Sequence, residues 1–134
     1  MSLTFSPCVL IPCYNHGAMM SRVLTRLQPF NLPCIVVDDG SDAATQQELD
    51  RLAVDTAGLT LIRLAENAGK GAAVIRGLEA AAEAGFTHAV QVDADGQHAI
   101  EDIPKLLELA QTHPAALISG QPIYDDSIPR SRLY

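Results

Sequence analysis

Short apolar runs alternate with segments of helical periodicity along the 134 residues of the chain. The apolar runs are rich in β-branched residues and are bounded by turn residues, which is typical of strands. The pattern predicts five strands, at residues 8–12, 34–39, 59–64, 88–93 and 115–120. It predicts four helices between and around them, at residues 17–28, 43–55, 68–85 and 99–113. Ser41 or Asp42 is the expected N-cap of the second helix, and Gly85 is the expected C-cap of the third.

This alternation predicts an α/β fold, with a mostly parallel sheet and helices on both of its faces. In such sheets, ligands bind beyond the carboxyl ends of the strands. A polar segment follows each predicted strand, in the order "PCYN", "DDGSD", "ENAGKG", "DADGQH" and "GQPIYDD". Because parallel strands all end at the same edge, we expect these five segments to lie together.

The composition fits a single packed globular domain covering residues 1–134, with 48% hydrophobic and 19% charged residues. Acidic residues outnumber basic ones by 16 to 9, the net charge is −7, and the basic residues are scattered. Binding to nucleic acid is therefore disfavoured. No apolar run approaches the roughly 20 residues of a membrane span, and the apolar start of the chain has no basic segment before it. A cytoplasmic location is expected.

The three cysteines, Cys8, Cys13 and Cys34, are interpreted as buried thiols rather than zinc ligands. Two of them fall inside predicted strands, and the chain has neither a CxxC motif nor a Cys/His spacing that suits zinc.

The segment "DADGQH" places Asp93 and Asp95 two residues apart at the end of an apolar run. Paired carboxylates at a strand end need a cation, a set of donors or open solvent to offset their desolvation. Mg²⁺ and Mn²⁺ prefer oxygen ligands, and Gln97 could supply a further one. A lone DxD motif is more often a solvated turn, but its coincidence with the other four polar segments favours a cation site.

The remaining segments supply groups suited to a nucleotide. Asp39 is the better candidate ligand of the acidic pair in "VVDDGS", while for Asp38 a turn role and a functional role remain equally open. Lys70 lies in a glycine-rich segment that opens a helix, a setting suited to an anion, although the P-loop spacing is absent. Tyr14 directly follows the first strand, where its ring could stack on a base or simply cover the sheet end.

The motifs "IPCYN", "VVDDGS", "NAGKGAAVIRG" and "VQVDADGQH", in this order, resemble those of glycosyltransferase family 2. Within that family, the chain is most similar to the branch of dolichyl-phosphate mannose synthases and polyprenyl-glycosyl transferases, over about residues 9–120. The resemblance implies a Rossmann-like GT-A fold that binds a nucleotide-diphosphate sugar, linked to UDP or GDP. It also implies inverting transfer supported by Mg²⁺ or Mn²⁺, to an acceptor such as a lipid or polyprenyl phosphate.

The same resemblance assigns roles by position. Pro12, Tyr14 and Asn15 would lie along the nucleoside, Asp39 would hold the base, and Lys70 would lie near the donor.

For the cation, the resemblance implies a set of three neighbouring residues. Asp93 would reach the ribose or the metal, Asp95 would be the main metal ligand, and Gln97 would supply a third. Family members usually continue into an acceptor-binding half. We therefore expect residues 1–134 to be a donor-binding portion that transfers sugar poorly alone, with the catalytic base beyond residue 134 and membrane association of the full-length protein.

Apolar residues such as Ile123 and Leu133 would then lack their usual cover, which predicts either a homodimer or a protease-sensitive tail. Two other functions remain open from the residues alone. A receiver-like signalling domain would share the parallel sheet and a Mg²⁺-binding acidic cluster, but would need its acidic pair after the first strand, where this chain has "PCYN". A sugar nucleotidyltransferase would need a basic, glycine-rich loop at that same place.

Overall fold

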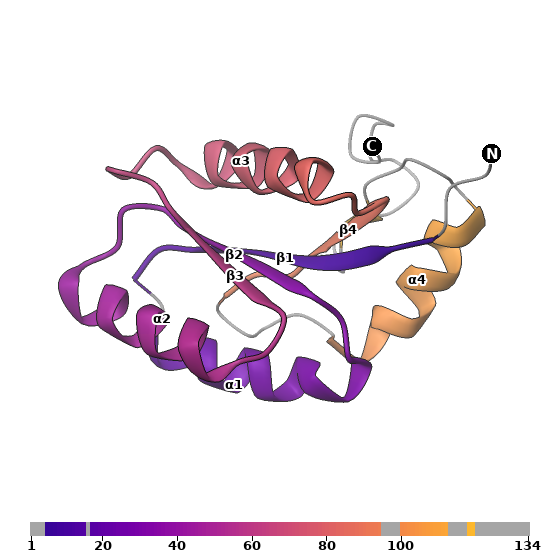
Figure 1. Ribbon diagram of the computed structural model, residues 1–134, viewed down its shortest axis with the longest axis horizontal. Coiled ribbons are helices and arrows are strands. Elements are labelled where there is room, and N and C mark those ends of the chain that lie inside the picture. The colour runs from indigo at the N-terminus through magenta and orange to yellow at the C-terminus, as the bar shows by residue number, and fades with distance from the viewer. Residues whose placement is uncertain (1–4, 16, 95–99, 113–117, 120–134) are drawn as a thin grey trace.

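The computed structural model of the chain describes residues 5–15, 17–94, 100–112 and 118–119. These residues form a five-stranded parallel sheet with the strand order β3-β2-β1-β4-β5, as Figure 1 shows. The strands are β1 (Pro7–Cys13), β2 (Cys34–Asp38), β3 (Leu59–Arg63), β4 (His88–Gln91) and β5 (Ile118–Ser119). The predicted α/β architecture is confirmed. The order is that of the Rossmann fold and not the 2-1-3-4-5 order of receiver domains, so the receiver alternative is wrong.

Helices cover both faces of the sheet. The α-helices are α1 (Gly17–Leu27), α2 (Ala43–Asp55), α3 (Lys70–Glu83) and α4 (Ile103–Thr112). Two short 3₁₀ helices precede β2 and α4, namely η1 (Gln28–Phe30) and η2 (Ile100–Asp102). In Figure 1, α3 lies on one side of the sheet, and α1, α2 and α4 lie on the other. None of the helices in the described residues is long and apolar enough to cross a membrane.

The central strand β1 is buried on both faces, which explains its unbroken apolar sequence. Successive side chains of a strand point to opposite faces. Accordingly, Val9 and Ile11 belong to the core beneath α1, α2 and α4, whereas Cys8 and Leu10 belong to the core beneath α3. Leu10 is fully buried.

The ends of the elements differ from their predicted limits by a few residues. Asp42 is the N-cap of α2, since its side chain accepts a hydrogen bond from the Thr45 N–H at 2.9 Å. Gly85 has the left-handed φ expected after a helix, but it lies one residue beyond the cap residue Ala84. Strand β4 ends at Gln91, two residues earlier than predicted, because the chain leaves the ladder before it reaches the acidic residues. Within the described residues, only Ile118–Ser119 of the last predicted strand pair with β4.

Candidate functional site

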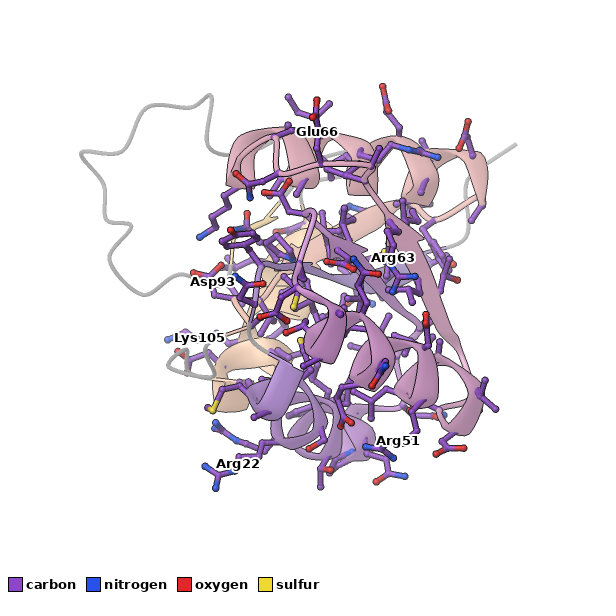
Figure 2. All side chains as sticks on the ribbon, turned by 90° about the vertical axis from the view of Figure 1, so that its left-hand side faces the viewer. Arg22, Arg51, Arg63, Glu66, Asp93 and Lys105 are labelled. Atoms are coloured by element: carbon purple, nitrogen blue, oxygen red, sulfur yellow. The ribbon has the colours of Figure 1, made fainter. Side chains whose placement is uncertain are left out.

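A cavity of about 300 Å³ opens at the carboxyl edge of the sheet. It lies beside the ends of β1 and β4, where the strand order reverses, which is the place where open α/β sheets bind ligands. Its lining comes from four segments that are far apart in the sequence: Pro12, Cys13, Tyr14, Asp39, Asn67, Gly69, Lys70, Asp93 and Ala94. Figure 2 looks onto this edge, with Asp93 toward its left and Arg63 toward its right.

Asp39 holds the connection between β3 and α3 against the end of β2. Its buried carboxylate accepts hydrogen bonds from the Ala68 N–H at 2.7 Å and the Gly69 N–H at 3.0 Å. The Asn67 side-chain amide donates to the same carboxylate at 3.1 Å and to the Asp39 carbonyl at 3.0 Å. Charge-assisted hydrogen bonds of this kind are among the strongest in proteins. Asp39 therefore fixes the loop that leads into α3, in addition to lining the cavity.

The close contact between these two loops requires a glycine at position 40. Gly40 has a φ of +72°, in the left-handed region that glycine adopts without strain. A Cβ atom placed there would lie 2.3 Å from the Asn67 backbone nitrogen. The loop can therefore reach Asp39 only because residue 40 has no side chain.

An ion pair spans the cavity between α3 and the end of β4. Lys70 Nζ lies 2.8 Å from Asp93 Oδ2 and 2.8 Å from Asp93 Oδ1. The Lys70 side chain is half exposed, whereas that of Asp93 is 17% exposed. Gln91 Nε2 donates to Asp93 Oδ1 at 3.3 Å from its buried position in β4. Lys70 and Gln91 therefore both contact the Asp93 carboxylate, on the α3 side of the sheet.

Asp38, which the sequence left open between two roles, does not line the cavity. It is fully buried and accepts from Arg63 Nε at 2.9 Å and from the Ser41 N–H at 3.0 Å. Arg63 also contacts Asp50 on α2 at 3.1 Å, and its pKa is raised, chiefly by the hydrogen bond to Asp38. Asp38 thus supports the junction of β2, β3 and α2, which is a structural role.

Asn15 is the one predicted nucleotide-binding residue that is absent from the cavity lining. Its side-chain oxygen accepts from the Asp42 N–H at 2.8 Å, and its own N–H donates to Ser41 Oγ at 3.0 Å. The residue has a φ of 57°, a left-handed conformation that asparagine tolerates better than most residues. Asn15 therefore joins the loop after β1 to the start of α2. Pro12 is buried in the cavity wall, and Tyr14 is 47% exposed at its rim.

The proposed cation ligands fall partly outside the described residues, since Asp95 and Gln97 both lie there. Among the residues that the structure describes, no group of three or more His, Cys, Asp or Glu side chains could hold a metal. Asp93 fits a hard cation in its donor chemistry, because its two oxygens line the cavity and already face the Lys70 ammonium. Asp93 would be one ligand among several, because such a cation needs more oxygen ligands than one carboxylate supplies.

Among the described residues, the polar side chains of Asn67 and Gln91 contact predicted site residues but were not anticipated from the sequence. In the sequence, nothing distinguishes Asn67 from other loop asparagines. Its side-chain amide donates hydrogen bonds to the carbonyl and the carboxylate of Asp39. Gln91 carries a clearer signal, because a polar residue within a strand that is buried on both faces needs a partner. That partner is Asp93, two residues farther along the chain.

All three cysteines are buried, as predicted. Burial raises the pKa of Cys8 to about 12, with a smaller contribution from neighbouring Cys34. Burial likewise raises the pKa of Cys34 to about 11. Both thiols are therefore protonated at neutral pH and are poor nucleophiles.

Comparison with known proteins gives a family match along nearly the whole chain. Residues 8–132 match the family model described as "Glycosyl transferase family 2". The match includes all four polar segments that form the cavity.

Several curated relatives share about a third of their aligned residues with this chain. The UDP-N-acetylglucosamine–dolichyl-phosphate N-acetylglucosaminyltransferase of Methanococcus voltae is 35% identical over 113 residues, covering 75% of this chain and 45% of that protein. The polyprenol monophosphomannose synthase of Mycolicibacterium smegmatis is 33% identical over 103 residues, covering 75% and 39%. The dolichol-phosphate mannosyltransferase of Saccharomyces cerevisiae is 32% identical over 124 residues, covering 87% and 45%. The chain thus spans somewhat less than half the length of these relatives.

Proposed function

The chain belongs to glycosyl transferase family 2, and we propose that its cavity binds the nucleoside diphosphate part of a nucleotide-sugar donor. One observation carries this proposal. Five of the six residues predicted to bind the donor line a single cavity, although they come from four separate segments: Pro12, Tyr14, Asp39, Lys70 and Asp93. The cavity volume of about 300 Å³ is at the lower end of the usual range for small-molecule sites.

Different groups around the cavity suit the base and the diphosphate of such a donor. The half-exposed ring of Tyr14 provides a surface on which a base can stack. Lys70, the first residue of α3, provides a positive charge next to a helix N-terminus, where diphosphate oxygens are favoured. Asp39 keeps that helix terminus in place through Ala68 and Gly69.

We further propose that Asp93 and Asp95 hold Mg²⁺ or Mn²⁺ together with the diphosphate, with Gln97 as a third ligand. A bound cation would neutralise the charge that develops on the diphosphate as it leaves. The proposed transfer is inverting: an acceptor oxygen forms a bond to the anomeric carbon while the bond from that carbon to the diphosphate breaks. A hydroxyl acceptor would give its proton to a carboxylate base, whereas a phosphate acceptor is already largely deprotonated at neutral pH and attacks as an anion. None of the described residues is assigned that role.

The acceptor class is proposed from the relatives. The names of these three relatives refer to dolichyl phosphate, polyprenol monophosphomannose and dolichol phosphate. We propose a polyprenyl phosphate as the acceptor of the whole protein, which would place its reaction at a membrane surface. The nucleotidyltransferase alternative is disfavoured by the family match and by the absence of a glycine-rich basic loop after β1.

Isothermal titration calorimetry with a panel of UDP- and GDP-sugars, with and without Mn²⁺, tests the proposal. We expect one of these nucleotides to bind, with Mn²⁺ strengthening its affinity. Asp95→Asn should weaken Mn²⁺-supported binding at least about tenfold, which corresponds to about 1.4 kcal/mol. Asp55→Asn removes an exposed carboxylate from the far end of α2 and is the matched control, expected to bind like the unchanged protein. Absence of binding by every donor, both with and without Mn²⁺, would contradict the proposed function.

A further inference from the structure

Lys70 and Asp93 form an ion pair with each other, although a different ligand is proposed for each of them. Asp93 is a proposed cation ligand, and Lys70 is the proposed partner of the diphosphate. In the structure they neutralise each other, with both carboxylate oxygens 2.8 Å from the ammonium nitrogen. A divalent cation that approaches Asp93 in this arrangement meets a positive charge already on that carboxylate. Cation binding and Lys70 binding at Asp93 therefore compete.

The surroundings keep Asp93 in place for this competition. Gln91 holds one carboxylate oxygen from the buried strand, and the main chain before Lys70 is fixed because Asp39 binds Gly69. The Lys70 side chain, by contrast, is half exposed and has four flexible carbons between its backbone and its charge. The ammonium group is thus the mobile partner of the pair, and the carboxylate is the fixed one.

We infer that Lys70 links the binding of the cation to the binding of the diphosphate. Without a diphosphate, the Lys70 ammonium group is paired with the Asp93 carboxylate. A bound diphosphate draws the ammonium group away from that carboxylate. This inference rests on the proposed function. Lys70 lines the same cavity as Asp93, so a diphosphate bound there offers its ammonium a second anion within reach. Once Lys70 moves to that anion, the Asp93 carboxylate is available to the cation. Each ligand therefore strengthens the binding of the other, by the same factor in both directions.

The direction of one mutational effect distinguishes this role from a simple contribution to binding. If Lys70 only attracted the diphosphate, its removal would weaken nucleotide binding and leave the affinity of the free protein for Mn²⁺ unchanged. If it also competes for Asp93, its removal must strengthen Mn²⁺ binding to the free protein.

The test uses Lys70→Met, which keeps the length of the side chain and removes its charge. Mn²⁺ affinity is measured by electron paramagnetic resonance, first without nucleotide and then with saturating UDP or GDP. We expect Lys70→Met to bind Mn²⁺ at least about threefold more tightly than the unchanged protein when no nucleotide is present. The nucleotide should then increase the Mn²⁺ affinity of the variant by a smaller factor, because the linkage is in part lost.

Two further variants serve as controls. Lys105→Met removes the charge of an exposed lysine on α4 and changes the net charge by the same amount, so it should leave Mn²⁺ binding unchanged. Lys70→Arg keeps the positive charge and should retain the Mn²⁺ affinity of the unchanged protein. Circular dichroism verifies that each variant is folded.

The possible outcomes test the linkage role of Lys70 separately from the proposed binding of a nucleotide sugar. Equal or weaker Mn²⁺ binding by folded Lys70→Met, without nucleotide, would overturn the linkage role even if nucleotide binding depends on Mn²⁺. Tighter Mn²⁺ binding by Lys70→Met, with Lys105→Met unchanged, would support the competition at Asp93. If neither UDP nor GDP binds the unchanged protein, the proposed function fails, whereas the measurement without nucleotide still decides the competition.

Discussion

Asp38 and Asp39 are adjacent in the chain, but their carboxylates hold different parts of the molecule. Asp38 binds Arg63 at 2.9 Å on the side of the sheet that α2 covers. Asp39 binds the loop before α3, through the Ala68 N–H at 2.7 Å. Since successive residues at a strand end point to opposite faces, one of the pair supports the fold and the other lines the cavity.

Asp38→Ala should lower the free energy of unfolding by about 2 kcal/mol, because it removes two hydrogen bonds from a fully buried carboxylate and leaves Arg63 with a weaker partner. Urea unfolding measures this loss. Asp50→Ala is the control, since it removes the exposed carboxylate partner of the same arginine and should cost less than about 1 kcal/mol. Equal effects of the two substitutions would show that burial of Asp38 is unimportant.

Gly40→Ala should destabilise the protein by more than about 2 kcal/mol, because the new Cβ would meet the Asn67 backbone at 2.3 Å and the residue must keep a positive φ. Gly85→Ala tests the effect of a positive φ without a steric contact. Gly85 has a φ of +88° but no atom within 4 Å of the position of a new Cβ, so its substitution should cost only about 1 kcal/mol. A similar loss for both variants in thermal unfolding would argue against a tight contact between the loops.

Gly77→Ala should also destabilise the protein, although alanine is the better helix former. A Cβ at this position in α3 would lie 2.1 Å from Leu10 Cδ1, and Leu10 is fully buried in the sheet. The expected loss of unfolding free energy is about 1–3 kcal/mol, as for other overpacked cores. Gly71→Ala in the same helix meets no atom within 4 Å and should be neutral or slightly stabilising. Chemical denaturation that ranks Gly77→Ala as the more stable variant would contradict this packing.

Tyr14→Ala should weaken binding of the nucleotide by about tenfold, because base stacking on an aromatic side chain is worth about 1–3 kcal/mol. The ring is 47% exposed and lines the cavity, so its loss should have little effect on stability. Tyr14→Phe keeps the ring and should retain most of the affinity. Calorimetry with the nucleotide identified by the donor panel makes the comparison. If the Phe variant binds as weakly as the Ala variant, the hydroxyl rather than the ring makes the contact.

The buried thiols predict a loss of stability at alkaline pH. The pKa values of Cys8 and Cys34 are about 12 and about 11 in the folded protein, against 9.0 for an ordinary thiol. The unfolded chain therefore releases protons at lower pH than the folded chain does, and the free energy of unfolding falls as pH rises from about 9 toward 11. Each thiol should contribute about 1 kcal/mol of loss at pH 10.

Urea unfolding at pH 8 and pH 10, under reducing conditions, tests this expectation. Replacing both Cys8 and Cys34 by alanine should make the pH dependence shallower, whatever other groups titrate in the same range. The same slope in the double variant would mean that the two thiols ionise as easily in the folded protein as in the unfolded chain.

The sequence by itself determined the class of fold and the edge at which the cavity lies. Strand and helix periodicity are local properties, so the alternation of elements could be predicted from residues that are close in the chain. The parallel arrangement then placed the ends of all strands together, and with them Tyr14, Asp39 and Asp93. The limits of β4 were less accurate, because where pairing ends depends on the neighbouring strand.

The division of tasks among the polar residues was decided only by the tertiary structure. Lys70 and Asp93 are 23 residues apart, and their ion pair exists because α3 crosses the sheet and begins beside the end of β4. Asp39 meets Ala68 across 29 residues, and Asp38 meets Arg63 across 25. Such contacts depend on how helices dock on the sheet and on which face each side chain occupies. A local pattern of residues contains no information on that docking, so the sequence could indicate the candidates but not their partners.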